Sequence, residues 1–177
     1  PAITILMGRD IPPYGGDTMW ANSVLAYAFL SDTMKETLAH LRVHMSARTV
    51  LAEVKKSAEK FGKKSLGGTP LHFDPEPMIA GAMHPLVRTH PVTGGKALYV
   101  DDSYAVSIEG MTEPEADTIL GFLRHHVTQP AFTCRLRWEP NTLTVWDNRL
   151  CLHHAFNDHD GARREMYRTT VLGEVPA

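Results

Sequence analysis

The stretch WDNRLCLHHAFNDHDGARREMYR, residues 146–168, combines a histidine pair with closely spaced arginines. We predict a final strand from about Arg164 to Leu172. Successive side chains of a strand point to opposite faces, so Arg164 and Arg168 share one face and Arg163 points away. If that face is the inner one, both guanidinium groups need an anionic partner, because a buried unpaired cation is costly and guanidinium fits a carboxylate. The alternative is a solvated outer face.

His153 comes shortly after a predicted strand at 143–146, where a short loop could direct its imidazole inward. Imidazole is a ligand for iron and zinc, and a site of two histidines and one carboxylate leaves positions open for a keto acid and dioxygen. One histidine among the chain's ten does not by itself establish a metal site, and His154 is an alternative candidate for the ligand. Cys151 and His153 could instead belong to a zinc or thiol-nucleophile site, but no second Cys/His pair has suitable spacing.

Composition favours one globular domain, 1–177, that acts on a small molecule. The chain has 43% hydrophobic residues and a formal net charge of -2, with no basic block of the kind that attracts nucleic acid or membranes. Its apolar runs are far shorter than the roughly 20 residues that span a bilayer. Cys134 and Cys151 are too few for a disulfide framework, which indicates reduced thiols and a cytoplasmic protein.

The pattern along the chain predicts an antiparallel β core with helical insertions. Strands are expected at 2–7, 96–104, 132–138, 143–146 and 164–172. A helix is expected to start at Asp17 or Thr18, a second after Ser31 and Asp32, and a third at the capping box of Thr112 and Glu115. Residues 45–83 are interrupted by glycine and proline, and we interpret them as a long, partly mobile loop that covers an active site.

Three stretches together resemble the taurine dioxygenase and aryloxyalkanoate dioxygenase family of iron(II)- and 2-oxoglutarate-dependent enzymes. They are GGDTMW at 15–20, HPLVRTHPVTG at 84–94 and the C-terminal stretch at 146–168. The resemblance implies a double-stranded β-helix, or jelly roll, that uses iron(II), 2-oxoglutarate and dioxygen. It also implies hydroxylation of a small anionic substrate, such as a sulfonate, sulfate ester or aryloxy acid, with release of succinate and CO2, and a homo-oligomeric protein.

The resemblance also implies residue roles. His153 matches the family's distal iron-ligand histidine, and Thr18 and Arg164 match the groups that bind 2-oxoglutarate. Arg168 matches an arginine near both the cosubstrate and the anionic group of the substrate. Trp146 would form an apolar wall beside them, or else simply pack in the core.

The family's other two iron ligands come from a His-x-Asp/Glu motif, expected within about ten residues before Pro1, and a single ligand cannot complete the iron site. We therefore expect a jelly roll that is incomplete at the N-terminus. His72-Phe73-Asp74 and His159-Asp160 have similar spacing, but they stand at the wrong place in the chain. The competing hypothesis is an inactive jelly-roll fragment or a protein that only binds a small anion.

Overall fold

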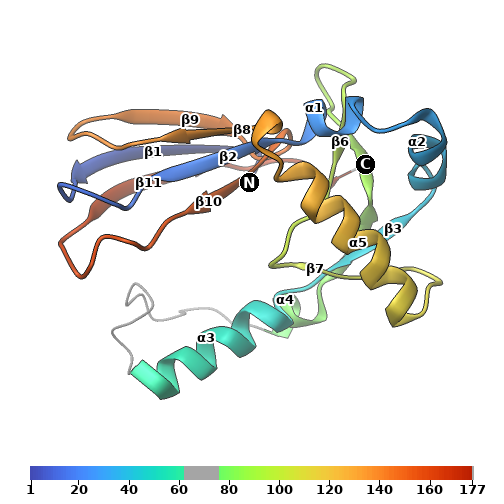
Figure 1. Cartoon of the computed structure of the whole chain (residues 1–177), viewed down its shortest axis with the longest axis horizontal. Coiled ribbons are helices and arrows are strands. Elements are labelled where there is room, and N and C mark those ends of the chain that lie inside the picture. Colours follow the sequence, from blue (N-terminus) through green and yellow to red (C-terminus); the bar gives the residue numbers. More distant parts are fainter. Residues whose placement is uncertain (62–75, 177) are drawn as a thin grey trace.

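Two three-stranded antiparallel sheets form one side of the molecule (Figure 1). The computed structural model describes residues 1–61 and 76–176. One sheet has the strand order β11-β1-β9 and the other β10-β2-β8. Their bounds are Ile3–Asp10 for β1, Thr18–Asn22 for β2, Thr133–Leu136 for β8, Leu143–Asp147 for β9, Cys151–Ala155 for β10 and Glu165–Val171 for β11. The prediction of a mainly β protein with helical insertions is confirmed.

The rest of the described chain packs beside these sheets and holds most of the hydrophobic core. It contains α1 (Ser23–Ala28), α2 (Asp32–Leu38), β3 (Arg42–Met45), β4 (Ala82–Pro85), β5 (Val87–Thr89), β6 (Lys96–Leu98), β7 (Ala105–Ile108), α5 (Glu113–Val127) and the 3-10 turn η1 (Pro130–Phe132). Strands β4, β3 and β7 form a third sheet, and β5 pairs with β6. The core cluster centres on buried aliphatic side chains such as Leu38, Val43, Leu86, Leu98 and Leu120. Most of this core cluster therefore lies outside the β11-β1-β9 and β10-β2-β8 sheets.

Helix α5 forms where its capping box predicts. The backbone N–H and the hydroxyl of Thr112 both donate to the Glu115 carboxylate, at 2.8 and 2.7 Å. Its apolar positions Leu120, Leu123 and Val127 are buried at helical spacing. Helix α2 is likewise capped by the Ser31 hydroxyl, as expected.

The prediction of a helix from Asp17 or Thr18 is wrong at its start. Residues 18–22 form strand β2, which is paired on both sides, with β8 and with β10. The helix begins only at Ser23, and the Asn22 side chain caps it by accepting from the N–H groups of Val24 and Leu25. Ladder hydrogen bonds from two neighbouring strands outweigh the helical spacing of the apolar residues.

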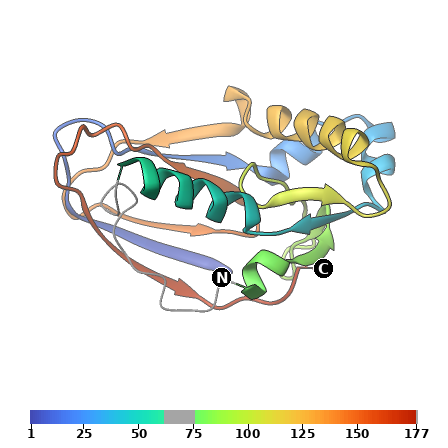
Figure 2. The same ribbon diagram turned by 90° about the horizontal axis from the view of Figure 1, so that it is seen from below.

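The interpretation of 45–83 as one long loop is also wrong in part. Helix α3 spans Arg48–Phe61 and a short helix α4 spans Glu76–Ala80. The α3 sequence is rich in Ala, Glu and Lys, which favour helices even where turn signals lie nearby. The helix lies below the two sheets in Figure 1 and in front of them in Figure 2. His72 and Asp74 lie outside the described residues, and a covering role for 45–83 stays a prediction.

A further boundary differs from expectation. The strand expected over 96–104 ends at Leu98, and the chain then turns at Asp101, whose carboxylate accepts from the N–H groups of Ser103 and Tyr104. In the described part of the chain, no helix is long and apolar enough to cross a membrane.

Candidate functional site

His153 lies within strand β10 and not in a loop, which corrects the sequence-based expectation. In the register of the β10-β2-β8 sheet, His153 stands opposite Trp20, and Ala155 stands opposite Thr18. Thr18, Trp20 and His153 therefore share one face. That face meets the other sheet, because the Trp146 ring on β9 lies 5.1 Å from the His153 ring and 5.4 Å from the Trp20 ring, measured between centroids. A ladder position fixes the imidazole direction more firmly than a loop would.

Arg168 faces the same space from the opposite sheet. Arg168 stands opposite Leu6 on β1. Thr170, two residues on and therefore on the same face of β11, stands opposite the fully buried Thr4. Burial, followed by the positive charge of Arg168, lowers the pKa of His153. Both effects favour the neutral imidazole, which is the form that binds a metal ion.

Arg164 lies at the end of this space, one residue before β11 begins. Its Nε donates to the carbonyl of Gly16 at 3.2 Å, and its Nη2 is buried without a hydrogen-bond partner among the described residues. Burial lowers the pKa of this guanidinium. Arg163, by contrast, is exposed and forms ion pairs with Asp10 and Glu165. Arg164 therefore has an unused donor that a carboxylate could satisfy, whereas Arg163 has none to spare for the interior.

The close approach of Arg164 requires glycine at position 16. Gly16 has φ +70°, and a Cβ placed there would lie 2.9 Å from both Cδ and Nε of Arg164. The Gly16 N–H is held by the Asp158 carboxylate at 2.8 Å. The Gly-Gly-Asp-Thr turn and the loop before β11 therefore pack directly against each other, and only glycine leaves room for this contact at position 16.

Thr18 is buried, and its hydroxyl oxygen accepts a hydrogen bond from the Trp138 indole N–H at 3.0 Å. An oxygen that accepts from Trp138 still has its own O–H to donate. Thr18 can thus offer a donor toward the space between the sheets, two ladder positions from His153.

Sequence reasoning missed Trp20 and Asn148. The Trp20 indole N–H is buried and has no hydrogen-bond partner in the part of the chain that the structure describes. Asn148 accepts from the Trp146 indole N–H at 2.9 Å and donates to the Thr4 hydroxyl at 2.8 Å, so it fixes the ring that packs on His153. Strand parity from Thr18 would have identified Trp20, whereas nothing local indicates Asn148.

The motif at 84–94 has a structural role that could not be seen in the sequence. The imidazole of buried His90 hydrogen-bonds with the Asp147 carboxylate at 3.1 Å, and Arg149 donates to the same carboxylate. Burial alone would raise the pKa of Asp147, but the hydrogen bonds from Arg149 and His90 hold it well below its ordinary value. Arg149 and the buried Arg88 both reach Glu174 near the C-terminus. This network anchors the turn that leads into β10.

A cavity of about 970 Å3 opens between the edge strands β8 and β9. Trp20, Leu136, Thr144 and Trp146 are among the residues that line it. Cys151 also borders it, but burial raises the pKa of this thiol to about 11, which leaves it protonated and unreactive at neutral pH. Within residues 1–61 and 76–176, no group of three or more His, Cys, Asp or Glu side chains is placed to hold a metal ion.

The chain is similar to known proteins along nearly its whole length. Residues 1–170 match the family model described as taurine catabolism dioxygenase TauD, TfdA family. The chain belongs to this family. An alpha-ketoglutarate-dependent dioxygenase of Penicillium expansum is 36% identical over 99% of the chain and 47% of its own length. An alpha-ketoglutarate-dependent sulfate ester dioxygenase of Pseudomonas putida is 32% identical over 99% of the chain and 56% of its own length.

A solved taurine dioxygenase from Burkholderia xenovorans shares the fold, with a TM-score of 0.80 and 37% identity over 99% of the chain and 54% of that protein. The chain thus spans about half the length of the relatives it matches. Alpha-ketoglutarate, named for these relatives, is 2-oxoglutarate, a keto acid with two carboxylates.

Proposed function

We propose that this chain is the C-terminal half of an iron(II)- and 2-oxoglutarate-dependent dioxygenase with a jelly-roll fold, which hydroxylates a small anionic substrate. The observation that carries the proposal is the buried, unpartnered Nη2 of Arg164. A guanidinium in that state is costly unless an anion completes its hydrogen bonds, and a carboxylate fits it best. 2-Oxoglutarate has such a carboxylate at the end distant from its keto acid group.

In this proposal Arg164 binds the distal carboxylate of 2-oxoglutarate, and the Thr18 hydroxyl donates a second hydrogen bond to it. His153 lies on the same sheet face as Thr18 and would supply one iron ligand through its neutral imidazole. The Trp146 ring packs against one side of the imidazole, and the Trp20 ring packs against Trp146. Arg168, on the facing sheet, would bind the anionic group of the substrate and also contribute to the field at the cosubstrate.

The described residues fit the carboxylate well but provide only one iron ligand. Iron(II), when bound, would supply the activation of dioxygen that side chains alone cannot provide. We propose that the remaining ligands, a His-x-Asp/Glu motif, precede Pro1 in the complete protein. The same proposal includes a homo-oligomeric, cytoplasmic protein that releases succinate and CO2.

We infer the substrate class from the activities for which the relatives are named and from the positive charge of Arg168. A sulfate ester dioxygenase and a taurine dioxygenase are among these relatives, and both names denote sulfur oxyacids or their esters. We therefore expect a sulfonate or sulfate ester, with an aryloxy or other carboxylic acid as the second choice.

The coding sequence immediately before Pro1 gives the first test. A His-x-Asp/Glu motif within about ten residues would supply the missing ligands for a two-histidine, one-carboxylate site. Without such a motif, the inactive fragment or simple anion-binding protein becomes the better explanation.

Succinate formation by the complete protein gives the second test. We would measure it with iron(II) and 2-oxoglutarate across alkanesulfonates, alkyl sulfates and aryloxy acids. Arg164→Ala should raise the KM for 2-oxoglutarate by about 10- to 100-fold, because a charge-assisted hydrogen bond contributes about 1.5–3 kcal/mol. Arg163→Ala is the matched control, since Arg163 is the exposed neighbour, and it should leave this KM near the wild-type value. Equal KM values for the two variants would contradict the assigned role of Arg164.

A further inference from the structure

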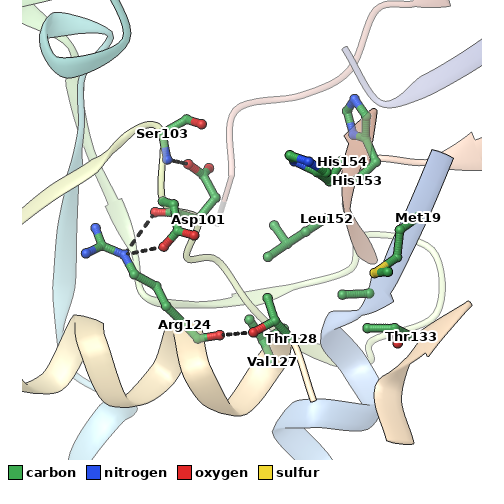
Figure 3. Close-up of a pocket in the computed structure, with 12 residues that line it drawn as sticks. Met19, Asp101, Ser103, Arg124, Val127, Thr128, Thr133, Leu152, His153 and His154 are labelled. Atoms are coloured by element: carbon green, nitrogen blue, oxygen red, sulfur yellow. Dashed lines mark hydrogen bonds and ion pairs between the residues drawn. The ribbon is translucent and has the colours of Figure 1, made fainter. Parts of the chain in front are cut away.

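A pocket of about 250 Å3 lies against strand β10, and the proposed iron ligand His153 is among the residues that line it. Leu152 and His154 line it, and their ladder partners Ala21 and Met19 line it with them. Side chains alternate along a strand, so this face is opposite to the one that carries Trp20 and the His153 ring. Figure 3 shows the far wall, which is built by Asp101 and Ser103 from one turn and by the last part of α5.

The charges at this far wall leave one carboxylate without an ionic partner. Arg124 forms an ion pair with Asp102 at 3.2 Å and donates to the backbone carbonyls of Asp101 and Ala105. Asp101 forms no ion pair within the described ranges, and the hydrogen bonds it accepts come from the N–H groups of Ser103 and Tyr104 to its Oδ1. Burial raises the pKa of Asp101, and the N–H groups of Tyr104 and Ser103 and the charge of Arg124 oppose this shift without cancelling it.

The hydroxyl groups of the pocket are arranged as acceptors. Thr128 donates its O–H to the carbonyl of Arg124 at 2.8 Å, and Thr133 donates its O–H to the carbonyl of Pro130 at 3.2 Å. A hydroxyl that has donated retains lone pairs, so both oxygens can still accept. Together with Asp101, these groups favour a ligand that is positively charged and donates several hydrogen bonds.

The remaining wall is apolar. Met19, Ala21, Val127 and Leu152 surround the space that these acceptors border. An alkyl chain of a few carbons would gain burial there at roughly 0.8 kcal/mol per methylene. The pocket therefore combines an anionic, acceptor-rich end with an apolar wall.

We propose that this pocket binds a primary alkylammonium group, with Asp101 as its counter-ion, Thr128 and Thr133 as acceptors, and the apolar wall around the alkyl chain. This site is additional to the proposed oxygenase function, although His153 borders both sites. Its test measures ammonium binding without iron or 2-oxoglutarate, so either proposal can fail without the other. An occupant would contact Leu152 and His154, the two neighbours of the proposed iron ligand.

The test uses n-butylammonium chloride as the probe, titrated into the protein at pH 8, where free histidine is mostly neutral. Calorimetry should show saturable binding, while butyrate and 1-butanol should bind at least about tenfold more weakly, because neither combines a positive charge with several donors. Asp101→Asn keeps the Oδ1 acceptor of the turn but removes the charge, and it should weaken butylammonium binding by at least about tenfold. Asp117→Asn is the matched control. Asp117 is exposed on helix α5, away from the pocket, so the loss of its charge should leave butylammonium binding unchanged.

Nitrogen-15 NMR spectra of the wild-type protein locate the site independently of any variant. The amide signals of Asp101, Val127 and Leu152 should shift along the titration. Equal binding to Asp101→Asn and wild type, equal binding of butyrate or 1-butanol, or shifts confined to other residues would each overturn the proposal. If Asp101→Asn does not fold, as judged by circular dichroism, the wild-type shift map and the three probes decide the question.

Discussion

Replacing Gly16 by alanine should lower both the stability of the fold and the affinity for 2-oxoglutarate, because Gly16 shapes the turn and also lies against Arg164. Gly16 adopts φ +70°, a conformation that costs an alanine roughly 1–2 kcal/mol. Its new Cβ would also lie 2.9 Å from Cδ and Nε of Arg164, so the side chain must move and its 3.2 Å hydrogen bond to the Gly16 carbonyl is strained or lost. A displaced guanidinium loses a charge-assisted bond to 2-oxoglutarate, worth about 1.5–3 kcal/mol, which corresponds to about 10- to 100-fold in affinity.

Gly94→Ala is the matched control, because Gly94 also has φ +70° and a Cβ there would meet nothing within 4 Å. Urea denaturation should show a similar backbone penalty in both variants. Calorimetric titration with 2-oxoglutarate, with and without iron(II), should show weaker binding only for Gly16→Ala. If both variants lose stability and both keep wild-type affinity, the contact between Gly16 and Arg164 does not position a cosubstrate clamp.

Three further outcomes follow from buried groups. Thr18→Val should lower the free energy of unfolding by about 1–3 kcal/mol, measured by urea denaturation, because the Trp138 indole N–H then loses its acceptor, whereas Thr18→Ser should cost less. The low pKa of Asp147 stabilises the fold above its unfolded pKa of about 3.9 and this contribution is lost as pH falls below that value, so the stability deficit of Asp147→Asn should shrink in acid. Since burial raises the pKa of Cys151 to about 11 while Cys134 is exposed, iodoacetamide at pH 8 should label Cys134 first, as peptide mass spectrometry would show.

Several parts of the site could be predicted because they depend on short-range rules. The parity of the last strand places Arg168 on the inner face, and the ion pairs of Arg163 agree with its predicted outward direction. The capping box at Thr112 defines the start of α5 for the same reason, since its hydrogen bonds join residues three apart. The residue roles themselves came from the family resemblance and stay proposals.

Other parts depended on partners far away in the chain. Residues 18–22 have helical spacing of apolar groups, yet they form a strand because β8 and β10 lie on either side. His153 is likewise held in a ladder, opposite Trp20, and not in the loop that its neighbours indicated. Pairing between strands more than a hundred residues apart leaves no mark on local periodicity.

The sequence by itself thus determined the mainly β class of the fold and the starts of the capped helices α2 and α5, because those follow from side-chain periodicity and local hydrogen bonds. Only the tertiary structure decided that Gly16 lies against Arg164, that Asn148 donates to Thr4 while it accepts from Trp146, and that Asp101 and His153 border one pocket. Each of these features brings together segments that are far apart in the chain, so it exists only after the sheets have packed against one another.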